Sequence, residues 1–268
     1  VPSRLPVPPK KAREKAQALL DEIFKERYDE TTNLEASQRF DALKELATEI
    51  YSLHRDEADP ITKFVILEMA VRIATESGDP TLTTEIIDEF NAQFEVDDLS
   101  LHVTAVNLWA KQAAKNFRNE QLQQKRLQLL NLILPLAERA EGEHRFRTAS
   151  KLYILASKQV SGDRKVNLLK IGRTLKNRAD IHDRMIRLAK ELKSPDEDSS
   201  LEDNAEKHET VGIYLCFTLD DWQTGLVHLA ASNSADLSEI AQLDLDSQAN
   251  LEGAVAVGDR WWDLKPSA

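Results

Sequence analysis

Apolar side chains recur every three or four residues along most of this chain, with charged residues between them. That spacing places the apolar residues on one side of a helix. The helices expected from it cover residues 9–28, 34–53, 60–77, 80–94, 98–115, 119–140, 146–160 and a long segment from 161 to 193, followed by 208–218, 222–231, 237–243 and 247–264. Little sequence is left for strands, so the predicted fold class is all-α.

Two Asp-Pro pairs, Asp59-Pro60 and Asp79-Pro80, each precede an apolar helical run, and Gly78 stands just before the second pair. Aspartate caps a helix, and proline is well suited to the first helical position because no N–H partner is needed there. Two such starts predict a helix, a tight turn and a second helix packed back on the first. This is the unit of a helical-repeat fold, a TPR-like α-solenoid of about six antiparallel helix pairs in a shallow right-handed arc. The 34-residue tetratricopeptide consensus is not met.

Changes in composition divide the chain into four parts. Residues 1–9 are a proline-rich extended arm, 10–193 the helical-repeat domain, 194–206 an acidic linker and 207–268 a small C-terminal helical subdomain. The helix over 60–77 is apolar nearly all round, which predicts neighbours on more than one side. Pro135 predicts a kink, and a break is expected around residues 177–180.

Positive charge is concentrated in one region of an otherwise acidic protein. The whole chain has a formal net charge of −11, yet residues 144–193 contain 14 basic and 4 acidic residues, a local net charge of +10. Such segregation can recruit an acidic protein, a polysaccharide or another polyanion. Binding of nucleic acid is the weaker hypothesis because aromatic residues that could stack on bases are sparse there. The band could also be two solvated helix faces, or could pair with the acidic linker. The candidate partner-binding residues are Arg164, Lys165, Arg173, Lys176, Arg178, Arg184 and Arg187.

No catalytic, cofactor or metal site is predicted. The six histidines show no metal-ligand spacing, and Cys216 stands between Leu215 and Phe217, where a small buried thiol is expected. The acidic pairs at 97–98, 196–198 and 220–221 stand where helix caps or solvated turns are expected. Gly253 and Gly258 have the glycine spacing of a phosphate loop but lack the lysine and the preceding strand, so helix packing is expected there.

The C-terminal third carries the most distinctive motifs. They are Leu215-Cys216-Phe217, Asp221-Trp222-x-x-Gly225-Leu226 and Gly258-Asp259-x-Trp261-Trp262-Asp263-Leu264. Together they resemble an uncharacterised helical module of planctomycete-type bacteria. The resemblance implies a removed signal peptide before Val1, an extracytoplasmic location with the cytoplasm as the alternative, and further helical sequence beyond the tryptophan pair. It brings no catalytic residues.

The sequence therefore predicts a non-catalytic protein-interaction scaffold. Binding of a polyanion or nucleic acid through residues 145–193 is the first alternative, and an enzyme of unrecognised type is the second. No apolar run reaches the roughly 20 residues that cross a bilayer, so membrane insertion is not expected. Trp261 and Trp262 complete the candidate partner-binding residues. Since adjacent helical residues point about 100° apart, one ring is expected to pack inward and the other to lie at the edge.

Overall fold

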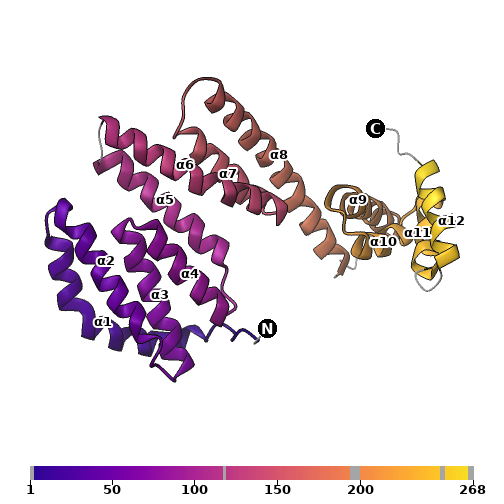
Figure 1. The fold of residues 1–268 in the computed structure, drawn as a ribbon. Coiled ribbons are helices and arrows are strands. Elements are labelled where there is room, and N and C mark those ends of the chain that lie inside the picture. Colours follow the sequence, from indigo (N-terminus) through magenta and orange to yellow (C-terminus); the bar gives the residue numbers. More distant parts are fainter. Residues whose placement is uncertain (1–2, 117–118, 194–199, 248–250, 265–268) are drawn as a thin grey trace. The chain divides into compact units, whose positions relative to one another are not determined.

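Helices make up nearly all of the structure. The computed structural model describes residues 3–116, 119–193, 200–247 and 251–264. Over these residues the chain is all-α, which confirms the predicted class (Figure 1). The helices are α1 (Lys10–Asn33), α2 (Ala36–Leu53), α3 (Pro60–Ser77), α4 (Pro80–Gln93), α5 (Asp98–Asn116), α6 (Asn119–Gly142), α7 (Phe146–Ser157), α8 (Gly162–Lys193), α9 (Leu201–Leu219), α10 (Trp222–Ala230), α11 (Ala235–Ser247) and α12 (Leu251–Asp263).

The chain divides into two compact units, residues 1–173 and 174–268, and the division falls within α8. In the first unit consecutive helices pack on one another from α1 to α7. In the second, α9, α10, α11 and α12 pack in the same consecutive manner. The sequence placed all of residues 10–193 in one domain. The C-terminal part of α8 instead contacts α9 inside the second unit, where His182 Nδ1 lies 2.9 Å from the Tyr214 hydroxyl.

Both predicted Asp-Pro helix starts are confirmed. The Asp59 carboxylate accepts a hydrogen bond from the Thr62 backbone N–H at 2.9 Å, and the Asp79 carboxylate accepts one from Leu82 at 3.0 Å. Gly78 ends α3 with a φ of 70°, a left-handed conformation that glycine adopts without the strain a Cβ would cause. The tight turn between α3 and α4 is therefore encoded locally.

The core of the first unit is built around α3, which contacts α1, α2, α4 and α5. This confirms the prediction that an all-round apolar helix would have neighbours on several sides. Three phenylalanines, Phe64, Phe90 and Phe94, meet edge to face with ring centroids 4.8 to 5.9 Å apart. Such aromatic pairs stabilise a fold beyond the area they bury.

The N-terminal arm is anchored rather than free. Leu5 forms an isolated bridge with Phe94: its N–H donates to the Gln93 carbonyl, and its carbonyl accepts from Glu95 N–H, both at 2.8 Å. The Arg4 guanidinium donates to the Asn91 side chain at 2.7 Å. The expected extended conformation is present, but residues 4–5 are paired with the end of α4 because an extended segment leaves its backbone groups available.

Two details of the helix prediction were wrong. α8 is continuous through residues 177–180, where no Pro or Gly interrupts the helix and the buried side chains of Leu175 and Ala179 keep their register. Residues 201–206, assigned to the acidic linker, form the first turns of α9, with the Ser200 hydroxyl accepting from Asp203 N–H at 3.1 Å. Residues 194–199 of the predicted linker lie outside the described residues. Pro135 does lie inside α6, and the kink stays a prediction.

In the part of the chain that the structure describes, no helix combines the length and the apolar character that a membrane span requires.

Candidate binding surfaces

The basic residues singled out in the sequence fall into both units. Arg164, Lys165 and Arg173 belong to the first unit, whereas Lys176, Arg178, Arg184 and Arg187 belong to the second. All are exposed except Arg178, which is half-buried. The predicted band is therefore not one surface of one unit. Residues 144–173 contain eight basic residues and one acidic residue, a net charge of +7, so the first unit holds the larger share.

The α7–α8 contact positions these first-unit cations. Gly172 lies against α7 so closely that a Cβ there would be 2.9 Å from Ile154 Cγ1 and 3.2 Å from the Ser150 carbonyl oxygen. The Ser150 hydroxyl, itself buried, donates a hydrogen bond to the Gly172 carbonyl at 2.6 Å. The limited space at this contact therefore requires glycine.

Two nearby arginines form ion pairs within the protein. Arg145 donates to both Asp97 carboxylate oxygens at 2.7 and 2.8 Å, and Arg139 donates to those of Asp98 at 2.6 and 3.0 Å. Hydrogen bonds from Arg145 hold the pKa of Asp97 well below its usual range. Bidentate pairs of this kind fix the geometry of both partners, so these arginines are not available to another molecule.

The remaining exposed cations of this region differ from Arg145. We define the basic surface as Lys151 of α7, Lys158 directly after the end of α7, and Arg164, Lys165, Lys170 and Arg173 of α8. Within the described residues none of the six takes part in an ion pair. The only carboxylate between residues 144 and 173 is Asp163, in the first turn of α8. Among the described residues, no carboxylate neutralises these cations through an ion pair.

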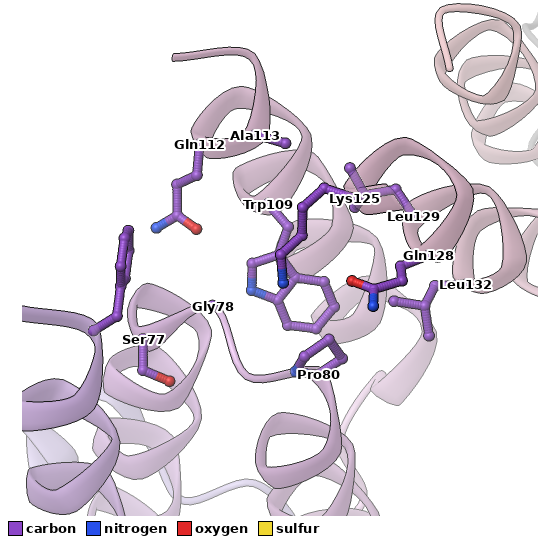
Figure 2. A pocket seen from close by; sticks show the side chains of 11 residues that line it. Ser77, Gly78, Pro80, Trp109, Gln112, Ala113, Lys125, Gln128, Leu129 and Leu132 are labelled. Carbon is purple, nitrogen blue, oxygen red and sulfur yellow. The ribbon is translucent and has the colours of Figure 1, made fainter. Parts of the chain in front are cut away.

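A second candidate is a pocket of about 160 Å³ at the turn between α3 and α4. Its apolar floor is Trp109, Ala113 and Leu129, and Pro80 lies beside the indole (Figure 2). Figure 2 shows Lys125 and Gln128 of α6 pointing toward Trp109, opposite Gln112 of α5. Sequence reasoning located the turn but missed the pocket, because α5 and α6 reach it only through tertiary packing.

The pocket wall is held by hydrogen bonds to the end of α3. The Trp109 indole N–H donates to the Thr75 carbonyl at 2.9 Å, and the Gln112 amide donates to the Glu76 carbonyl at 3.0 Å. Both satisfy carbonyls that have no partner inside α3. Since these groups have structural partners, the pocket offers an apolar recess with few polar groups left for a ligand.

The C-terminal tryptophans follow the predicted division of roles. Trp261 is half-buried and meets Trp222 and Phe217 edge to face, with centroids 5.4 and 6.0 Å apart, and its indole N–H donates to Asp244 at 2.8 Å. Trp262 is 72% exposed. Trp261 therefore belongs to the core of the second unit, whereas Trp262 offers its ring to solvent.

Cys216 is poorly suited to act as a nucleophile. The side chain is buried as predicted, and burial raises the pKa of its thiol to about 12. A thiol with that pKa is protonated at neutral pH, whereas the thiolate is the nucleophile. A Cβ on Gly225 would come 2.4 Å from the sulfur, which shows how tightly α9 and α10 enclose it.

The acidic pairs act as caps where the structure describes them. The Asp97 carboxylate accepts from Ser100 N–H at 3.0 Å, and that of Asp221 accepts from Thr224 N–H at 3.1 Å. The pair region at 196–198 lies outside the described residues. Across the described residues, no group of three or more His, Cys, Asp or Glu side chains could hold a metal ion. Gly253 and Gly258 lie in α12.

Comparison with protein-family models, curated proteins and solved structures finds no match to this chain.

Proposed function

We propose that this chain is a non-catalytic protein-interaction scaffold whose basic surface binds an acidic segment of a partner protein. The observation that carries the proposal is the set of six exposed cations of the basic surface, none of which has an ion pair in the described residues. Some exposed cations elsewhere in the first unit do pair, such as Arg27 with Glu49 and Lys44 with Asp79. Uncompensated charge of one sign attracts a partner of the opposite sign and speeds the encounter.

Apolar side chains among these cations favour a protein over nucleic acid. Val166 is 63% exposed and Ile171 is 40% exposed. The aromatic residues of this region, Phe146 and Tyr153, are buried. Nucleic-acid surfaces use exposed aromatic rings for base stacking, whereas protein interfaces combine apolar contacts with arginine.

The test measures the affinity of the full chain for a fluorescent glutamate-rich peptide. Fluorescence anisotropy monitors the binding at low and at physiological salt. The variant carries Lys151→Glu, Lys165→Glu and Arg173→Glu. The control carries Lys11→Glu, Lys15→Glu and Lys25→Glu, three exposed positions of α1 that change the net charge equally. If each lost contact contributes up to about 1 kcal/mol, we expect the surface variant to bind on the order of 10-fold or more weakly, with the control unchanged.

Equal weakening in both variants would show an effect of net charge alone and would contradict the proposal. The same titration with heparin and with duplex DNA separates the partner classes. Preference for heparin or DNA over the peptide would replace the acidic protein with a general polyanion.

We infer further that the first unit is a repeat array of the α-solenoid type. Support comes from the consecutive packing of its helices and from the two chemically equivalent Asp-Pro starts. In such arrays neighbouring pairs contribute separately to stability, so amide hydrogen exchange should reveal stepwise loss of protection from one end of the unit. Simultaneous loss across all its helices would contradict this arrangement.

The resemblance to the planctomycete-type module and an extracytoplasmic location remain proposals that rest on the C-terminal motifs. Fractionation of cells that make the complete native protein tests the location. Recovery only with the cytoplasm would exclude it.

A further inference from the structure

Two histidines of the second unit meet through their ring nitrogens. His208 of α9 and His228 of α10 place their Nδ1 atoms 3.1 Å apart, with ring centroids 4.9 Å apart and ring planes inclined by 39°. Both side chains are half-buried at the contact between the two helices. The pair has no part in the basic surface or in the pocket.

Two Nδ1 atoms that face each other at this distance need a proton or a metal ion between them. A neutral imidazole carries one protonated and one unprotonated ring nitrogen. If both rings kept their protons on Nε2, two lone pairs would oppose each other at 3.1 Å. In the metal-free protein, one ring must therefore be the Nδ1–H tautomer and donate to the other.

The surroundings of both rings disfavour the protonated imidazolium. Burial lowers the pKa of His208, and burial together with His208 and Lys193 lowers the pKa of His228. Neutral imidazole is the form that ligates metal ions.

The spacing fits a chelated ion. With metal–nitrogen bonds of about 2.0–2.1 Å, nitrogens at this separation subtend an angle of about 100° at the metal. We propose that His208 and His228 bind one divalent transition-metal ion, of the Cu²⁺, Ni²⁺ or Zn²⁺ class, through their Nδ1 atoms. On binding, the donor ring moves its proton through solvent from Nδ1 to Nε2, so no net proton is lost. Water completes the coordination.

One neighbouring charge opposes the ion. Lys193, at the C-terminal end of α8 and in the same unit, lowers the pKa of His228 through its positive charge, and the same charge disfavours a cation. Lys207, next to His208 in sequence, is paired with Glu191 at 3.4 Å. Lys193 therefore provides a way to raise the affinity without touching either ligand.

The experiment is isothermal titration of the full chain with CuSO₄, NiCl₂ or ZnCl₂ at pH 7.5. We expect one Cu²⁺ per chain, with Ni²⁺ and Zn²⁺ weaker in keeping with the usual order of divalent ions. His208→Gln and His228→Gln should each weaken binding by at least the roughly 10-fold that loss of an outer-sphere partner costs. Lys193→Gln should strengthen it. His102→Gln is the matched control, because His102 is also half-buried with its pKa lowered by burial.

Unchanged binding in both ligand variants, or equal loss in His102→Gln, would overturn the site. Electron paramagnetic resonance of the unmodified chain loaded with Cu²⁺ tests the site independently, because it uses no variant that could fail to fold. Coupling to two imidazole nitrogens supports the site, and coupling to one or none contradicts it.

Discussion

The Ser150 hydroxyl donates its hydrogen bond to the carbonyl of Gly172, where α7 and α8 are in close contact. This contact joins the two helices that carry the basic surface. It depends on the absence of a side chain at residue 172, since a Cβ would contact both Ile154 and the Ser150 backbone.

Gly172→Ala should therefore destabilise the first unit. The added methyl group would stand 2.9 Å from Ile154 Cγ1, so the helices must separate or Ile154 must leave its position. Overpacking of this kind costs about 1–3 kcal/mol. Denaturant unfolding monitored by circular dichroism measures the loss. Gly142→Ala is the control, because a Cβ there meets nothing within 4 Å, and it should leave the unfolding midpoint nearly unchanged.

Removing the Trp109 hydrogen bond should have a moderate effect. Trp109→Phe keeps an aromatic ring in the floor of the pocket but loses the donor to the Thr75 carbonyl. That carbonyl retains the Gly78 N–H at 3.2 Å, so loss of the hydrogen bond alone should cost about 1 kcal/mol. The smaller ring at this buried position adds to that cost. Trp262→Phe, at a 72% exposed position, should stay within about 0.5 kcal/mol of the unmodified chain. A larger loss in Trp262→Phe would mean that its ring packs against the protein in solution.

The parts of the fold that could be predicted from the sequence are those fixed by residues close together in the chain. The starts of α3, α4 and α10 follow from Asp59, Asp79 and Asp221, whose caps act within three residues. The missing break in α8 and the bridge of Leu5 to Phe94 depend on contacts with distant segments, which a helical period does not contain. The same limit applies to the sites: charge counting found the basic residues, but the divided band, the Trp109 pocket and the His208–His228 contact required the packed helices.

Stability should fall as the solution is acidified. The folded-state pKa of Asp97 is lowered by the Arg145 guanidinium. The unfolded chain then binds this proton more readily than the folded protein does. The contribution of the Asp97–Arg145 pair to stability is fully present above the pKa of Asp97 in the unfolded chain, which is about 4. It is lost as the pH falls through the lower pKa of the folded protein. Thermal unfolding between pH 5 and 2 should show this decline.

Asp97→Asn tests the assignment of that decline. The variant should be less stable at pH 7 and lose less on further acidification. Glu22→Gln replaces an exposed carboxylate outside any ion pair of the described residues, so its acid profile should match that of the unmodified chain. Identical profiles for all three proteins would place the acid-sensitive group elsewhere.

The Cys216 thiol should report on opening of the second unit. Its pKa of about 12 in the folded protein exceeds the ordinary thiol value of about 8.5. By the same linkage, its contribution to stability is complete below the unfolded pKa and is lost as pH rises toward the folded one. A disulfide reagent at pH 8 should therefore modify the native chain slowly and the denatured chain rapidly. Gly225→Ala, whose Cβ would meet the sulfur at 2.4 Å, should speed labelling by forcing α9 and α10 apart. Rapid, complete labelling of the unmodified native protein would mean that the α9–α10 contact does not enclose the thiol in solution.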